Sequence, residues 1–294
     1  MTERIIKTFG ISTALLTPFH ADGGLNLPLL CEHANDVLRQ GTHGVTLFGT
    51  TGEGASIGSS ERTEAIRALC DSGLPVGAIT LGVGGPAVQD VLSQVTQGAD
   101  LGITQFLLLP PFYFKGVDDD GLFRWHASLF ETAGHRARFI LYHIPQITQI
   151  PLSVDLILRL HRAFPERILA VKDSSGQWDN TRALLECDGP PILVGDERLL
   201  HKALPMGAAG SICGMANLHP ARLRRLFDTH AEDADLSSEV DLIVSGPVIP
   251  ALKQAMVTLT GNADWGNLRP PLGPLGAEAK AAITARFRDT EDVS

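Results

Sequence analysis

Short apolar runs alternate along the chain with longer segments in which apolar residues recur every three or four positions. The runs have few polar interruptions, as expected of strands covered on both faces. The longer segments have the spacing of amphipathic helices. We therefore expect strands at 10–16, 45–48, 75–81, 104–109, 138–142, 168–171, 191–194 and 210–214, and helices at 27–40, 60–71, 87–99, 118–133, 153–164, 178–187, 197–206 and 220–230.

Strand and helix thus alternate about eight times, with short connections. This order favours a parallel sheet with crossover helices, and at that count a closed barrel is the economical arrangement. A doubly wound open sheet is the alternative, but it would call for a nucleotide-binding fingerprint. The glycine-rich segment 82–85 has neither the required spacing nor an acidic partner about 20 residues further on. The predicted fold class is therefore α/β, a (β/α)8 TIM barrel.

The alternating pattern ends near residue 230, and the remaining chain is helical in character. We expect helices at 237–245 and 248–260, separated by Pro247 and Pro250. A third helix is expected at 276–289, after a proline-rich segment. Residues 1–230 are therefore predicted to form the catalytic barrel, and residues 231–294 a C-terminal helical region packed on it.

Composition narrows the classes of function. The chain has 294 residues and a formal net charge of −9, which argues against binding nucleic acid. Its four cysteines lack metal-ligand spacing and suggest reduced thiols, so we expect a cytoplasmic protein without a metal site. No apolar run approaches the length of a membrane span, and the N-terminus lacks the apolar core of a signal peptide. A small-molecule substrate is the expected partner.

A lysine stands at the end of the apolar run 168–171. Active sites of such barrels lie at the C-terminal ends of the strands, which is where Lys172 is expected. Burial disfavours the charged form of a lysine, and a neutral amine can attack a ketone to form an imine. A strand-end lysine that simply reaches water is the alternative interpretation, because lysines are usually exposed.

Other strand ends supply groups that could assist an imine. Tyr142 ends the strand before Lys172 and could transfer a proton at a substrate oxygen. Tyr113 and Thr50 could extend a proton relay, and the Gly-Thr-Thr-Gly loop at 49–52 could bind a carboxylate through N–H groups and hydroxyls. An ordinary loop and buried structural tyrosines are the alternatives. The chain has only two tyrosines, and both fall at strand ends.

Five motifs occur in order: GTTGE at 49–53, PPFY at 110–113, Y-x-x-P at 142–145, VKDSSG at 171–176 and RPPL at 269–272. Together they resemble the dihydrodipicolinate synthase / N-acetylneuraminate lyase superfamily over nearly the whole chain. That superfamily consists of class I, Schiff-base-forming, pyruvate-dependent aldolases on a (β/α)8 barrel with a C-terminal helical region. The resemblance implies a lyase that needs no cofactor and assembles as a homotetramer.

The resemblance also implies roles for four catalytic residues. Lys172 is similar to the imine-forming lysine and Tyr142 to the catalytic tyrosine. Thr50 matches the hydroxyl of the proton relay. Tyr113 matches the relay tyrosine that can be supplied across a subunit interface.

Further positions resemble the substrate site. Gly49 and Thr51 match the region that binds the pyruvate carboxylate, and Ile212 matches a position whose backbone carbonyl lines the site. Glu197 falls near acidic residues that sialic acid lyases use for substrate hydroxyls. Its alternative is structural, because the first turn of a helix favours acidic groups.

The chain departs from the superfamily pattern after Tyr142. Dihydrodipicolinate synthases place there an arginine that binds the carboxylate of the aldehyde substrate. Ile147 occupies that position, and an apolar side chain cannot replace a bidentate carboxylate ligand. Ile147 followed by Thr148 is more similar to the sialic acid lyases and the 2-keto-3-deoxy sugar acid aldolases. Thr148, with Gln146 and Gln149, could hydrogen-bond a polyhydroxy chain.

We therefore expect reversible cleavage of a 2-keto-3-deoxy acid, with a sugar acid favoured, into pyruvate and an aldehyde. One alternative is a 4-hydroxy-tetrahydrodipicolinate synthase with a rearranged carboxylate site, condensing pyruvate with aspartate semialdehyde. A second is a non-catalytic pyruvate-binding paralogue that keeps the barrel.

Overall fold

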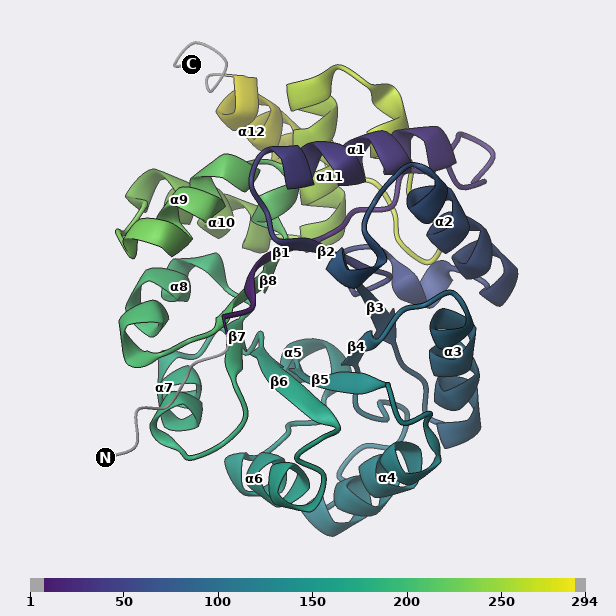
Figure 1. The fold of residues 1–294 in the computed structure, drawn as a ribbon. Helices are drawn as coiled ribbons and strands as arrows, with labels where there is room; N and C mark the ends of the chain where they lie inside the picture. The colour runs from purple at the N-terminus through teal and green to yellow at the C-terminus, as the bar shows by residue number, and fades with distance from the viewer. Residues whose placement is uncertain (1–7, 289–294) are drawn as a thin grey trace.

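The eight strands form a closed parallel barrel in the computed structural model, which describes residues 8–288 (Figure 1). Each strand pairs with the next one in the sequence, and the last pairs with the first. The predicted (β/α)8 TIM barrel is therefore confirmed. The strands are β1 (Gly10–Ala14), β2 (Gly44–Leu47), β3 (Ile79–Val83), β4 (Gln105–Leu108), β5 (Arg138–His143), β6 (Ile168–Asp173), β7 (Ile192–Val194) and β8 (Gly210–Cys213).

Helices follow the strands and form the outer ring seen in Figure 1. Several begin where a side chain accepts a hydrogen bond from a free backbone N–H group, as the Asp118 carboxylate does from Gly121 N at 2.7 Å. The helices are α1 (Leu27–Arg39), α2 (Ser59–Asp71), α3 (Val88–Asp100), α4 (Asp119–Thr132), α5 (Pro145–Thr148), α6 (Val154–Ala163), α7 (Trp178–Glu186), α8 (Glu197–Ala203), α9 (Pro220–Thr229), α10 (Ala234–Val244), α11 (Val248–Thr260) and α12 (Ala277–Arg288).

Short 3-10 helices complete the described chain at Gly54–Ser56, Val76–Ala78, Leu204–Met206, Met215–Asn217 and Ala263–Gly266. Across residues 8–288, every helix is too short or too polar to cross a bilayer. The N-terminal segment 1–7, in which we looked for a signal peptide, lies outside the described residues, as does 289–294.

Three sequence expectations need correction. The segment 143–151, for which we expected a loop between the strand 138–142 and the helix 153–164, contains the short helix α5, which begins at Pro145, a position that suits the fixed φ of proline. The expected strand 75–81 starts instead as a 3-10 turn, and β3 runs to Val83. Helix α10 starts at Ala234 rather than at 237, because the Asp233 carboxylate accepts from Leu236 N at 2.9 Å and caps it.

The C-terminal helices pack on the barrel rather than standing apart. In Figure 1, α10 lies beside α8 and α9, while α11 and α12 lie near α1. These helices share one buried apolar core with the last strands, to which Leu200, Leu223, Leu252 and Phe287 contribute. The division of the chain at residue 230 remains a prediction.

A buried ion pair joins α11 to the loop after β2. Lys253 Nζ contacts Glu53 Oε1, and both side chains are almost wholly shielded from solvent. Lys253 also donates to the Asn267 carbonyl at 2.6 Å and lies 4.4 Å from the centroid of the Phe19 ring. The other Glu53 oxygen accepts from Arg269 N at 3.1 Å. The pair thus holds together segments that are far apart in the sequence.

Arg269, from the RPPL motif, continues this network. Its guanidinium donates to the Gly23 and Ser56 carbonyls at 2.8 and 2.9 Å, and to the Glu61 carboxylate at 2.9 Å. It also lies 4.5 Å from the Phe19 ring centroid. The segment after α11 is therefore anchored to the loops that follow β1 and β2.

Replacing Lys253 with methionine should strongly destabilise the protein, because Glu53 would keep a buried charge without its cation. Removing one partner of a buried pair costs about 3–5 kcal/mol, so the free energy of unfolding should fall by that amount. Urea denaturation followed by circular dichroism measures it.

Arg39→Met is the matched control, because Arg39 pairs with Asp36 on an exposed surface. That loss should stay below about 1 kcal/mol. Adding Glu53→Gln to Lys253→Met should recover part of the lost stability. If Lys253→Met and Arg39→Met lowered the free energy of unfolding equally, the buried pair would contribute no more to stability than an exposed one.

Candidate active site

The register of two neighbouring strands places Tyr142 directly beside Lys172. Lys172 Nζ donates to Tyr142 Oη at 3.2 Å and lies 4.3 Å from the centroid of that ring. Each side chain is only 4% exposed. An amine and a phenol are thus held within hydrogen-bonding distance, away from bulk water.

Asp173 fixes the turn that follows the lysine. One carboxylate oxygen accepts from Ser175 N at 3.0 Å, and the other accepts from the Thr181 hydroxyl at 2.7 Å and from the Asn180 amide at 3.1 Å. These bonds connect the end of β6 to the start of α7. The position of Lys172 is therefore set by the strand below it and by the turn above it.

His143, opposite Asp173 in the strand pairing, has a structural contact. Its Nδ1 accepts from Leu152 N at 3.1 Å, which ties the end of β5 to the segment before α6. Burial lowers the pKa of His143, so the ring accepts this bond in its neutral form.

A buried carboxyl lies near the lysine. Glu197 is 6% exposed, and its Oε1 accepts from Met215 N at 2.8 Å. Burial raises the pKa of Glu197, while the charge of Lys172 acts in the opposite direction. Burial, together with the charge of Glu197, also raises the pKa of the Cys213 thiol. Glu197 is therefore a buried carboxyl close enough to Lys172 for the two charges to influence each other.

A cavity of about 550 Å³ opens over these groups. Seven of the residues selected from the sequence line it: Thr50, Thr51, Tyr142, Ile147, Lys172, Glu197 and Ile212. Gly49 lines a neighbouring cavity of about 410 Å³, and the two cavities share Tyr142. The structure thus brings together side chains from the ends of several strands.

Tyr113 and Thr148 line neither of these two cavities. Tyr113 is 71% exposed and makes an edge-to-face contact with Phe114 at a centroid distance of 5.3 Å. Thr148 is 2% exposed, and its hydroxyl donates to the Ile144 carbonyl at 3.1 Å and accepts from Ile150 N at 3.2 Å. Within this chain, Thr148 therefore satisfies backbone groups of its own loop rather than facing the cavity.

The cavity also has a wall that sequence reasoning missed. The residues that form it recur at helical spacing on one face of α10 and one face of α11: Val240, Ile243, Val244, Val248, Ile249 and Leu252. In the sequence, that spacing indicates burial but does not distinguish a packed core from a cavity wall. Arg198 lines the cavity as well, but its guanidinium is bound to Asp196 and Asp241, each at 2.6 Å.

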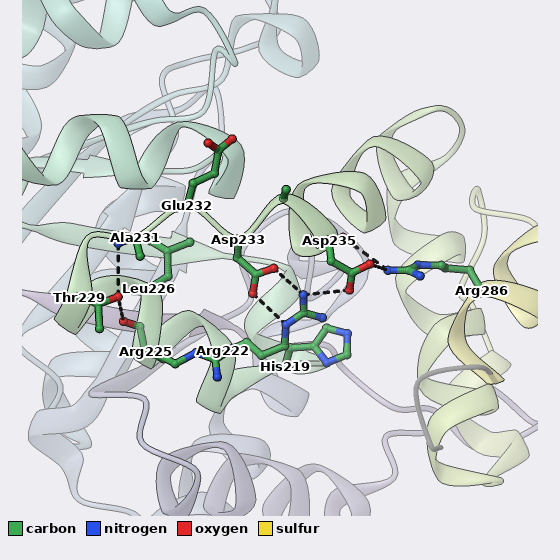
Figure 2. A pocket seen from close by; sticks show the side chains of 11 residues that line it. His219, Arg222, Arg225, Leu226, Thr229, Ala231, Glu232, Asp233, Asp235 and Arg286 are labelled. Carbon is green, nitrogen blue, oxygen red and sulfur yellow. Dashed lines mark hydrogen bonds and ion pairs between the residues drawn. The ribbon is translucent and has the colours of Figure 1, made fainter. Parts of the chain in front are cut away.

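A second hollow, of about 1050 Å³, lies on the outside of the barrel between α9, α10 and α12 (Figure 2). Its charges are paired: Arg222 contacts Asp233 at 2.7 Å, and Arg286 contacts Glu239 at 3.0 Å. It shares no lining residue with the cavity over Lys172. We assign it to the packing of the C-terminal helices.

The chain is similar to known proteins along its full described length. A 34% identical relative, over 289 residues and 95% of each chain, is the "Uncharacterized DapA-like lyase" of Chloroflexus aurantiacus. A 4-hydroxy-tetrahydrodipicolinate synthase of Anaeromyxobacter sp. (strain K) is 28% identical over 286 residues, covering 93% of this chain and 94% of that one.

Among solved structures, the dihydrodipicolinate synthase of Agrobacterium tumefaciens superposes with a TM-score of 0.92 at 38% identity, covering 96% of this chain and 99% of that one. The model of the Dihydrodipicolinate synthetase family matches residues 7–289. With this match, the closed barrel and the lysine at the end of β6, the chain belongs to the dihydrodipicolinate synthetase family and is a lyase.

Proposed function

We propose that this lyase is a Schiff-base-forming, pyruvate-dependent aldolase that reversibly cleaves a 2-keto-3-deoxy acid into pyruvate and an aldehyde. The observation that carries the proposal is the 3.2 Å contact between Lys172 Nζ and Tyr142 Oη beneath a cavity of about 550 Å³. The amine is the nucleophile that attacks the substrate ketone, and the phenol can transfer a proton to or from a hydroxyl of the same substrate molecule.

In the proposed scheme, the neutral amine of Lys172 attacks the C2 carbonyl, and water leaves to give an iminium ion. Tyr142 takes the proton of the C4 hydroxyl and passes its own proton towards Thr50. The C3–C4 bond breaks, its electron pair forms the C2=C3 bond of an enamine while the π pair of the iminium moves to nitrogen, and the aldehyde departs. The proton taken from the C4 hydroxyl is returned to C3 of the enamine, and addition of water then releases pyruvate and regenerates the amine. Because the iminium is the electron sink, the scheme requires no further cofactor.

The other selected residues fit this scheme as binding groups. Gly49 and Thr51 offer backbone N–H and hydroxyl donors for the substrate carboxylate, and Ile212 offers its carbonyl. Glu197 has a second oxygen that can accept a bond from a substrate hydroxyl. Tyr113 would reach the relay from a neighbouring subunit, which is why we propose a homotetramer.

The synthase alternative has less support from the cavity. Ile147 is 60% exposed at the cavity and carries no group that binds a carboxylate. Among the described residues that line the cavity, the cations are Lys172 and Arg198, and Arg198 is already paired with Asp196 and Asp241. A second substrate carboxylate would therefore meet no available cation among the described residues that line this cavity. The names of several relatives nevertheless make the synthase the second candidate.

The non-catalytic alternative has less support, because a protein that only binds pyruvate does not need a buried contact between an amine and a phenol, as Lys172 and Tyr142 make here. A cytoplasmic location is also part of the proposal. It is supported by free thiols at Cys31, Cys70 and Cys213.

Borohydride reduction in the presence of pyruvate should attach a reduced pyruvyl group to Lys172, because the imine is trapped as a stable amine. Peptide mass spectrometry locates the adduct, and Lys172→Ala should give none. Absence of the adduct on folded wild-type protein would rule out the Schiff-base mechanism and favour the binding-module alternative.

Tyr142→Phe should still form the adduct, but its kcat for cleavage should fall about 10²–10⁴-fold through loss of the proton-transfer group. Assays with pyruvate and aspartate semialdehyde run alongside. Faster turnover of that pair than of any keto acid would establish the synthase instead.

As the pH is lowered, kcat/KM for the keto acid should begin to fall at a higher pH than it would if it depended on an ordinary glutamate, whose pKa is about 4.3. Burial raises the pKa of Glu197, so the carboxylate that accepts the substrate hydroxyl is lost earlier as the pH decreases. Glu197→Gln should remove this acidic limb and raise KM more than it lowers kcat. An unchanged pH profile in Glu197→Gln would assign the limb to another group.

A further inference from the structure

The part of the cavity that α10 and α11 form is apolar. Helix α10 contributes residues at positions i, i+3 and i+4, namely Val240, Ile243 and Val244. Helix α11 contributes Val248, Ile249 and Leu252, at positions i, i+1 and i+4, and Leu272 adds to this wall. We call this set the apolar wall.

Three apolar side chains at the cavity remain open to solvent. Ile147 is 60% exposed, Val244 43% and Val248 40%. All three line the cavity, and they come from α5, α10 and α11. A substrate that covers them would remove apolar surface from water, which contributes roughly 25 cal/mol per Å².

The polar groups of the same region are largely occupied. The Gln146 amide donates to the Ser174 carbonyl at 2.6 Å, and the Ser175 hydroxyl accepts from Gln177 N at 3.2 Å. Arg198 and Asp196 bind each other, as described above. The side chains that α10 and α11 place at the cavity are all apolar. A chain of hydroxyls buried against these two helices would therefore find no side-chain partner there, although each hydroxyl needs one when it is buried.

We propose that the aldehyde released by this enzyme carries an aliphatic or aromatic group, which binds against the apolar wall, and that Val244 and Val248 determine this specificity. The inference rests on the proposed aldolase function and replaces the sugar acid favoured from the sequence. The sequence supported a polyhydroxy chain through Thr148, but the structure turns that hydroxyl into its own loop. Lys172 and Tyr142 keep the same roles, and only the fragment beyond C4 changes.

The test compares two aldehydes with the same number of carbons, butanal and erythrose, each condensed with saturating pyruvate. Borohydride trapping on Lys172 comes first, so that failure of imine formation is recognised separately. Mass spectrometry then follows the 4-hydroxy-2-keto acid product. Wild-type enzyme should favour butanal over erythrose in kcat/KM by about tenfold or more, the discrimination typical of hydrophobic pockets.

The double variant Val244→Thr/Val248→Thr keeps side-chain volume and branching but makes the wall more polar. The butanal-to-erythrose ratio should fall roughly five- to tenfold, with pyruvate trapping unchanged. Val117→Thr is the matched control, because Val117 is 39% exposed but does not line the cavity, and its ratio should equal that of the wild type.

Three outcomes would overturn the proposal. Erythrose used as well as butanal by the wild type would show that the wall does not select the aldehyde. An unchanged butanal-to-erythrose ratio in the double variant would show that Val244 and Val248 do not select the aldehyde. A changed molecular mass of the assembly in that variant, with the aldehyde preference intact, would assign these valines to contact between copies of the chain. Absence of the pyruvyl adduct would instead remove the proposed aldolase function, and this inference with it.

Discussion

The buried pair of Glu53 and Lys253 is the interaction on which the assembled site depends. Moving two charges out of water is costly, and the attraction between them offsets that cost only when other groups complete their contacts. Here the Asn267 carbonyl, the Phe19 ring and Arg269 N supply those contacts. The loop that carries Thr50 and Thr51 and the helix that carries the apolar wall are consequently held in one arrangement. The cavity exists because these two parts of the chain cannot move apart independently.

The lysine is the nucleophile best placed in this environment. Cys213 lies on β8, two strands away from Lys172, but burial and the nearby Glu197 raise the pKa of its thiol and so disfavour the reactive thiolate. Lys172 instead donates to Tyr142 beneath an open cavity, where a ketone can reach it. Burial therefore has different effects on the two groups. It suppresses ionisation of the Cys213 thiol, whereas it keeps the Lys172 amine away from bulk water.

Much of the fold could be predicted from the sequence because strands covered on both faces and amphipathic helices have different periodicities. The pairing of Tyr142 with Lys172 followed from the same logic, since each ends one of two successive strands. Helix α5 could not be predicted, because four residues are too few to show a period. The orientation of Thr148 was also beyond reach, because it depends on a loop closed by its own hydrogen bonds. The apolar wall could not be predicted either, because apolar residues at helical spacing look the same in a sequence whether they pack in a core or line a cavity.

The cavity draws its chemistry and its shape from separate parts of the chain. Strands β5 and β6 supply the amine and the phenol, whereas the turn between α10 and α11 carries the valines that a substrate would meet. Gly246 in that turn has open space around it, so the turn can accept larger residues without displacing a neighbour. Mutations there can accumulate without disturbing the barrel. A gene encoding this scaffold could thus acquire a new substrate through a few changes in one surface hairpin while retaining its reaction.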